Sequence, residues 1–282
     1  FMDISVVLSV GGTNLKDNIG DLNNNPHIVI GTPGRVLDMI NKKALNTRHL
    51  KLLVIDEADE MLSKIFLNQI YDIFRFLPQD IQVALFSATM NTEFFALTKR
   101  FMRNPVELLL KNDELTLEGI KQFYVNVSLN DYKYECLCDL FDMVSISQSI
   151  IYCNSKRGVM DLVERLTNDD FSVLMMHGEM SQEERNGIMS KFRNGEGRIM
   201  VSTDLLARGI DIQQISIVLN YDLPNSIENY IHRIGRSGRY GRKGTAINFA
   251  TDNDIKKVTE LEQYYSTQIE PLPDKNILAS LL

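Results

Sequence analysis

An acidic cluster follows directly after a short apolar run near the start of the chain. Asp56, Glu57 and Asp59 come after Leu52–Ile55, a run that predicts a buried strand. Ligands of open α/β sheets bind beyond the carboxyl ends of the strands. Asp56 is therefore a candidate for holding a Mg²⁺ that bridges nucleotide phosphates, directly or through water. Glu57 is a candidate for polarising an attacking water, and a helix N-cap is the alternative for this motif.

Two hydroxyls end the next apolar run, Gln82–Phe86. Ser87 and Thr89 would lie beside the Asp56 strand end if the two strands are neighbours. They can then hydrogen-bond Asp59 and couple the state of the nucleotide to the rest of the molecule. Taken by itself, this motif favours the alternative that Thr89 is a helix N-cap.

Phosphate contacts are expected at two other strand ends. A helix N-terminus that carries a hydroxyl and an arginine attracts phosphate, and a glycine pair lets backbone approach a ligand closely. The residues concerned are Gly11, Gly12, Thr32, Pro33, Gly34 and Arg35. The proline suits the first helical position. A tight turn is an equally good alternative for either motif alone.

The segment His232–Arg239 is the most specific motif of the chain. His232, Arg236 and Arg239 are spaced i, i+4 and i+7, which predicts one face of a helix. Arginines presented in this way can reach a γ-phosphate held by another domain and stabilise the charge of the transition state. A solvated basic stretch, or plain phosphate binding, is the alternative.

Further nucleic-acid candidates follow other strands of the second half. Thr203 and the backbone of Gly209 suit an RNA phosphate, and Asp211 suits a ribose hydroxyl. Gly209 and Asp211 are also candidates for binding the nucleotide, together with Asp56, Arg236 and Arg239. Gln182 and Arg185 begin a helix that a capping box predicts from residue 181 to about 193. These two can approach the RNA backbone, although a surface helix face is the favoured interpretation.

Short apolar runs alternate with helical patterns, which is typical of an α/β fold with mostly parallel sheets covered on both faces. The predicted strands are Ser5–Val10, His27–Gly31, Leu52–Ile55, Gln82–Phe86, Val106–Leu110, Lys121–Val127, Ser149–Cys153, Ser172–Met176, Arg198–Ser202, Ile215–Asn220 and Thr245–Phe249. Helices are predicted at Gly34–Lys43, Phe66–Phe76 and Glu93–Met102.

The rhythm of strands and helices breaks once, at a polar stretch. We therefore expect a first domain over residues 1–110, a linker over 111–118 and a second domain over 119–282. At 282 residues the chain is long enough for two hydrophobic cores. The pattern begins in mid-domain at Phe1, so we expect the first domain to be incomplete at its N-terminus.

Composition excludes some classes of function. The net charge is −7 and neither half is basic, so nucleic-acid contacts must come from local clusters. No apolar run approaches a membrane span of ~20 residues. Three cysteines without metal-ligand spacing suit a reducing, intracellular setting, cytoplasmic or nuclear. Cys136 and Cys138 can be a redox pair, but ordinary packing is favoured. A monomer is expected.

These motifs, in this order, resemble the DEAD-box RNA helicases over essentially the whole chain. Within that family the sequence is similar to the branch of translation initiation factor 4A and its exon-junction relative. The segments that carry the closer resemblance are Asp113–Phe123, Asn220–Pro224, Tyr230–Gly244 and Tyr264–Ile269.

The resemblance implies two RecA-like domains that close over ATP, Mg²⁺ and single-stranded RNA, clamp the RNA and separate short duplexes locally. It also implies a protein scaffold as partner. The positions that match catalytic residues are Asp56, Glu57, Arg236 and Arg239, and those that match coupling residues are Ser87, Thr89 and His232, joined by Asp59. Gly12, Thr32, Arg35, Asn154, Arg185 and Thr203 match positions at or near RNA.

One expected motif is missing, which leaves two functions open. No G-x-x-x-x-G-K-[ST] loop occurs in the sequence, nor do the adenine-reading glutamine segment and the P-T-R-E-L-A segment of the family. We expect all three upstream of Phe1. The chain is then a piece of an RNA helicase, or else a non-catalytic module that binds RNA or a scaffold. A DNA helicase of the same superfamily is disfavoured.

Overall fold

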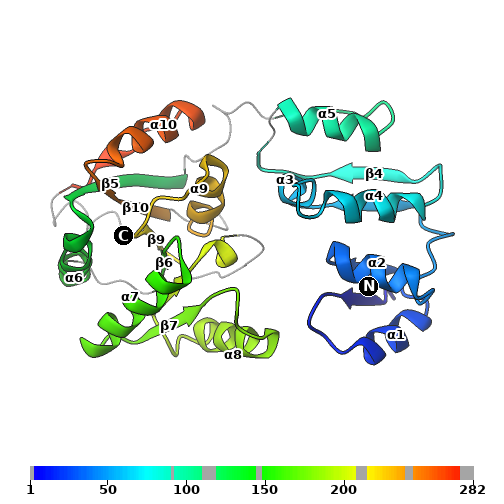
Figure 1. The fold of residues 1–282 in the computed structure, drawn as a ribbon, viewed down its shortest axis with the longest axis horizontal. Coiled ribbons are helices and arrows are strands. Elements are labelled where there is room, and N and C mark those ends of the chain that lie inside the picture. Colours follow the sequence, from blue (N-terminus) through cyan, green and yellow to red (C-terminus); the bar gives the residue numbers. More distant parts are fainter. Residues whose placement is uncertain are drawn as a thin grey trace. The chain divides into compact units, whose positions relative to one another are not determined.

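The structure is a computed structural model that describes residues 3–89, 92–109, 119–143, 148–207, 215–238 and 244–273. The chain divides into two compact units, Phe1–Glu107 and Leu108–Leu282. Both units are built from parallel strands and helices, as the sequence predicts (Figure 1). No helix among the described residues is long and apolar enough to cross a bilayer.

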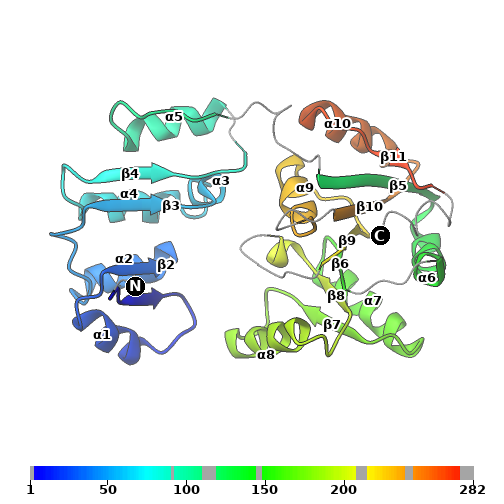
Figure 2. The ribbon, with the colours of Figure 1, turned by 180° about the vertical axis from the view of Figure 1, so that it is seen from behind.

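The described part of the first unit contains two short parallel sheets (Figure 2). β1 (Val6–Ser9) pairs with β2 (Ile28–Gly31), and β3 (Leu52–Ile55) pairs with β4 (Gln82–Leu85). The helices are α1 (Leu15–Asn23), α2 (Pro33–Asn41), α3 (Ala58–Met61), α4 (Leu67–Arg75) and α5 (Thr92–Phe101). The predicted strands and helices of this unit are thus confirmed to within one or two residues, with the exception of the last strand.

The first unit differs from expectation in how its strands are covered. One side of β3 contributes Ile55 to a core with α4, but Leu52 and Val54 on its other side are about half exposed. Leu8 of β1 is 62% exposed. The prediction that both faces are covered is therefore wrong for this unit, because the described helices pack on one side of each strand pair only.

The predicted strand Val106–Leu110 is not formed over its described residues, 106–109. Val106 is 87% exposed, and Leu110 lies outside the described residues. A strand requires a hydrogen-bonded neighbour. No described strand pairs with these residues, so their β-branched and apolar character is not sufficient.

The second unit is a seven-stranded parallel sheet in the order β11-β5-β10-β9-β6-β8-β7. Its strands are β5 (Ile120–Ser128), β6 (Ser149–Tyr152), β7 (Val173–Met176), β8 (Ile199–Ser202), β9 (Ile217–Asn220), β10 (Gly244–Thr251) and β11 (Glu270–Pro271). The six strands predicted after the polar stretch are all present. Residues of β6, β8, β9 and β10 are buried throughout, as expected for strands covered on both faces.

Helices cover both faces of this sheet. The helical segments are η2 (Asn130–Tyr132), α6 (Lys133–Met143), α7 (Lys156–Asn168), α8 (Gln182–Arg193), η3 (Asp204–Leu206), α9 (Ile227–Ile234) and α10 (Ile255–Tyr265). α6 and α7 pack with Ile151 and Ile247, whereas α8 packs with Ile150 and α9 and α10 pack with Ala246 on the opposite face. α8 begins with the predicted capping box of Ser181 and Glu184.

The three cysteines are free thiols. Burial is the main cause that raises the pKa of Cys136, Cys138 and Cys153 above the ordinary thiol value. A raised pKa leaves little thiolate at neutral pH, and residues two apart on a helix do not face each other. The packing interpretation of Cys136 and Cys138 on α6 is therefore the better supported one.

Candidate functional site

The acidic turn of the first unit lies where β3 and β4 end side by side. Ile55 pairs with Leu85, and the backbone N–H of Ala58 donates to the carbonyl of Phe86 at 2.9 Å. The two strands are thus neighbours, as the motif argument requires. Their carboxyl ends bring the acidic turn of β3 and the hydroxyl motif of β4 to one edge.

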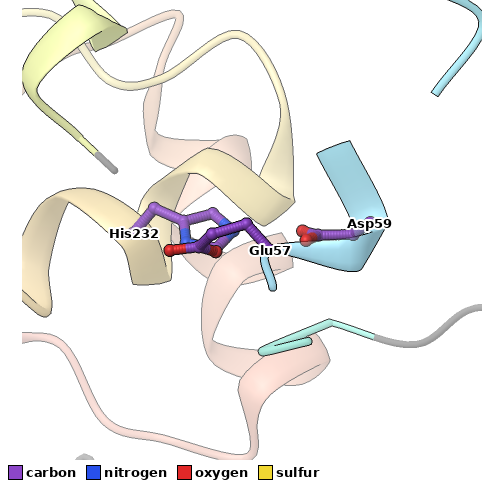
Figure 3. A group of neighbouring side chains, drawn as sticks. All are labelled: Glu57, Asp59 and His232. Carbon is purple, nitrogen blue, oxygen red and sulfur yellow. The ribbon is translucent and has the colours of Figure 1, made fainter. Parts of the chain in front are cut away.

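Glu57 adopts an unusual backbone conformation in this turn. Its φ of 48° and ψ of 48° are left-handed, a region that costs a non-glycine residue about 1–2 kcal/mol. Its N–H donates to Oδ1 of the exposed Asp56 at 2.9 Å. Figure 3 draws Glu57 before α3 and Asp59 on α3. Backbone outliers of this kind concentrate at functional sites.

The predicted hydroxyl contact with Asp59 is confirmed for Thr89 but not for Ser87, whose hydroxyl donates elsewhere. Thr89 Oγ1 donates to Asp59 Oδ2 at 2.7 Å, and Ser87 Oγ donates to the carbonyl of Thr89 at 2.7 Å. Thr89 is buried, so this bond is shielded from water. The Thr89 hydroxyl therefore links the motif after β4 to the helix that follows the acidic turn.

The glycine turn and the start of α2 meet at the ends of β1 and β2. The N–H of Gly11 donates to Thr32 Oγ1 at 3.3 Å, and Thr32 N–H donates to the carbonyl of Ser9 at 3.1 Å. Gly12 has a φ of 79°, which favours glycine. Pro33 is the first residue of α2, as predicted, and Gly34 follows it.

Arg35 braces the glycine turn. Its guanidinium donates to the carbonyl of Thr13 at 2.8 Å and to the Thr13 hydroxyl at 3.1 Å. It also reaches Oδ1 of the buried Asn18 at 3.4 Å. Asn18 is not among the residues predicted from the sequence. Its signal in the sequence is a polar residue between Leu15 and Leu22 on the inward stripe of a helix.

α9 ends earlier than the motif spacing predicts. The helix stops at Ile234, Gly235 is its C-cap, and the Ser237 hydroxyl donates to the Ile234 carbonyl at 2.8 Å. The prediction that His232 and Arg236 share one helix face is therefore wrong. Gly235 caps the helix, and the chain then turns through Gly238, which has a left-handed φ of 71°. Arg239 lies outside the described residues.

The arginines of this motif are not a solvated basic stretch. Arg233 is fully buried and Arg236 is 7% exposed. Arg236 Nε donates to the carbonyl of His232 at 3.2 Å. Burial of charged side chains requires partners, so the solvated-stretch alternative is excluded for these two residues.

Asn154 lies in the turn after β6 and has its polar atoms occupied. Its Oδ1 accepts from Arg233 at 2.7 Å, and its Nδ2 donates to the carbonyl of Leu223 at 2.8 Å and to Asn225 Oδ1 at 3.2 Å. Its N–H donates to Asp222 Oδ2 at 3.1 Å. Both amide hydrogens are used within the protein.

The remaining candidates of the second unit lie on α8 and next to β8. Gln182 Nε2 donates to Asn186 Oδ1 at 3.0 Å, and the Arg185 guanidinium donates to the carbonyl of Gly178. Thr203 is half-buried and precedes η3. Gly209 and Asp211 lie outside the described residues.

Parallel α/β units with polar motifs beyond their strand ends form the RecA-like architecture of ATP-dependent helicases. The DEAD/DEAH box helicase model matches residues 1–96, and the helicase conserved C-terminal domain model matches residues 132–241. A protein of Phaeosphaeria nodorum described as "ATP-dependent RNA helicase eIF4A" is 55% identical over 97% of this chain and 69% of its own length. The chain belongs to the DEAD-box helicase family.

Solved structures agree with this assignment. Dbp5 of S. cerevisiae bound to RNA and ADP BeF3 matches with a TM-score of 0.90 and 33% identity, over 99% of this chain and 72% of that chain. A Dbp5 variant bound to a Gle1 variant and IP6 matches with a TM-score of 0.79 and 32% identity, over 100% of this chain and 74% of that chain.

Proposed function

We propose that the chain is the larger part of an ATP-dependent RNA helicase of the initiation factor 4A type. It would couple ATP binding and hydrolysis to clamping of single-stranded RNA and to local unwinding of short duplexes. The observation that carries the proposal is the bond between Thr89 and Asp59 at one edge of β3 and β4. It supports a site in which the acidic turn and the hydroxyl motif respond to the same ligand.

The residues divide into three roles in this proposal. Asp56 offers an exposed carboxylate at a strand end, which suits Mg²⁺ bound with ATP, and Glu57 polarises the attacking water. Arg236 and Arg239 stabilise the γ-phosphate charge, with Gly209 and Asp211 contacting the nucleotide. Ser87, Thr89, Asp59 and His232 couple the two domains.

RNA is held mainly through its backbone in this proposal. Thr32 and Thr203 supply hydroxyls. Gly11, Gly12 and Gly34 let the protein backbone approach the RNA closely. The proposed contacts also include Pro33, Arg35, Asn154, Gln182 and Arg185. Residues 1–110 and 119–282 would be the two domains of an intracellular monomer, joined by residues 111–118. The Dbp5 complex with a Gle1 variant supports a protein scaffold as a further partner.

A second candidate function is a non-catalytic module, and it rests on the sequence alone. The 282 residues contain no G-x-x-x-x-G-K-[ST] loop, so they lack the backbone N–H cradle and the lysine that neutralise the β- and γ-phosphates. A chain with only these residues would act as a non-catalytic module that binds RNA or a scaffold.

RNA-stimulated ATP hydrolysis separates the two. We expect the purified 282-residue chain to show little or no turnover, and a longer product that carries the loop to hydrolyse ATP when RNA is added. The coding sequence upstream of Phe1 shows whether such a product exists. Robust hydrolysis by the 282-residue chain would contradict the assigned need for the loop.

A further inference from the structure

Arg233 is a fully buried cation of the second unit. Its Nε lies 2.5 Å from Asp204 Oδ1, and one terminal nitrogen donates to Asn154 Oδ1 at 2.7 Å. The other donates to the carbonyl of Asp222 at 2.7 Å and to Asn220 Oδ1 at 3.2 Å. One fully buried guanidinium therefore satisfies four acceptors.

Three of these acceptors come from separate turns at the carboxyl edge of the sheet, and the fourth, Asn220, is the last residue of β9. Asn154 follows β6, Asp204 opens η3 after β8, and Asp222 follows β9. Arg233 itself is on α9, directly after His232. The contacts thus tie α9 to the turns that hold Asn154 and Thr203, two candidates for RNA contact.

We propose that Arg233 is a positioning residue that fixes the RNA-side turns relative to α9. The inference rests on the proposed function and goes beyond it in one respect. Asn154 has both amide hydrogens and one oxygen lone pair in use, so this network fixes the turn through which Asn154 is proposed to contact RNA.

Only arginine suits this position. A planar fork can serve several acceptors in different directions, whereas a lysine ammonium is a single point with three donors. Asn229 Nδ2, also on α9, donates to Asp204 Oδ2 at 3.2 Å, so the carboxylate is held from two residues of the same helix. A lysine at 233 would leave at least one of the buried acceptors unsatisfied.

Tyr230 supplies a matched control on the same helix. It is fully buried, and its hydroxyl donates to Gln122 Oε1 at 2.9 Å and accepts from Asn248 Nδ2 at 3.2 Å. These partners belong to β5 and β10. Asn248 Oδ1 also accepts from Asn220 Nδ2 at 2.8 Å, so two side chains separate Tyr230 from Arg233 along these bonds. Tyr230→Phe therefore removes buried hydrogen bonds of α9 without removing any bond to the RNA-side turns.

Amide hydrogen exchange on the 282-residue chain tests the inference without any ligand. The probes are the hydrogen-bonded amides of Asn154, Leu206 and Ala207. We expect Arg233→Lys to speed exchange at all three by on the order of 10-fold, with Tyr230→Phe leaving them unchanged. Unchanged exchange in Arg233→Lys, or equal acceleration by Tyr230→Phe, would overturn the proposal.

A second arm measures poly-U affinity in a double-mutant cycle, using the loop-bearing form with an ATP analogue present. Arg233→Lys and Asn154→Ala should each weaken binding by about 10-fold, and the double variant should bind as tightly as the weaker-binding single variant. A loss of about 100-fold in the double variant would mean that the two residues act independently, and would overturn the proposal. If the loop-bearing form without substitutions does not bind poly-U, the proposed function fails while the exchange arm still decides this inference.

Asp204→Asn replaces Arg233→Lys if the lysine variant does not fold, as judged by far-UV circular dichroism. It keeps the shape of the acceptor and removes its charge. The same faster exchange is expected at Asn154, because Arg233 loses the partner that orients its guanidinium. Normal exchange at Asn154 in a folded Asp204→Asn variant would overturn the proposal.

Discussion

At the scale of single residues, the Thr89 hydroxyl joins the motif after β4 to Asp59 on α3. The contact between Thr89 and Asp59 follows from two motifs on neighbouring strands, and it is present at 2.7 Å. The burial of Arg233 and Arg236 does not follow from the sequence, because the arginines of a basic cluster can be exposed to solvent or buried among polar groups. Only the positions of Asp204, Asn154 and Asn220 around one guanidinium decide between them.

Glu57 carries the residue-scale prediction. In a form of the protein that hydrolyses ATP, Glu57→Gln should lower kcat by about 10²–10⁴, because it removes the carboxylate that polarises the attacking water. Shape is kept, so binding of an ATP analogue and of RNA should change little. Steady-state ATPase kinetics together with equilibrium binding check both parts.

Glu60→Gln is the matched control for Glu57→Gln, since it makes the same chemical change on α3. It should leave kcat within about 3-fold of the unmodified protein. The assigned role of Glu57 is wrong if its variant keeps full turnover, or if both variants lose activity equally.

At the scale of elements, helix caps and apolar periodicity predict well where helices and strands begin and end. Whether a neighbouring element pairs with a strand or packs on it is not encoded in the local sequence. The capping box places the start of α8 correctly at Gln182. The run Val106–Leu110 has strand composition but no paired neighbour over its described residues. The end of α9 depends on a C-cap at Gly235, a local signal that the i, i+4, i+7 spacing overlooks.

The capping box gives a stability prediction. Ser181 Oγ accepts from the Glu184 N–H at 3.2 Å, and Glu184 accepts from the Ser181 N–H at 2.7 Å. Ser181→Ala should lower the free energy of unfolding by about 1 kcal/mol in urea titrations. Ser190→Ala, an exposed change inside the same helix, should cost nothing. Equal losses in the two variants would show that the cap is not the cause.

The same cap has a pH dependence. Hydrogen bonds from the Ser181 backbone and side chain hold the pKa of Glu184 below its ordinary value. A depressed folded-state pKa means that the stabilisation is present above the unfolded pKa of about 4.3 and is lost as pH falls through the lower folded value. The stability difference between the unmodified chain and Glu184→Gln should therefore shrink below about pH 4. A difference that grows on acidification would contradict this assignment.

At the scale of the whole molecule, charge limits how RNA can be held. The chain carries 30 basic and 37 acidic residues, with a net charge of −7. Few phosphates can be neutralised by such a protein, so the dependence of affinity on salt should be shallow. Arg35 already donates to Thr13 and Asn18, which leaves hydroxyls and backbone as the main proposed contacts.

If the protein contacts the sugar-phosphate backbone of RNA and not its bases, binding should not depend on base sequence. It should still require RNA in place of DNA. No proposed contact supplies an aromatic platform on which splayed bases could stack. Choosing RNA over DNA then depends on contacts with the 2′-hydroxyl. The measurement is a binding series across salt with an ATP analogue present, using the loop-bearing form and comparing poly-U, mixed-sequence RNA and matching DNA. We expect equal affinity for the two RNAs and much weaker binding of DNA. Equal binding of the DNA, or a strong preference for one RNA sequence, would show that the backbone-reading model is mistaken.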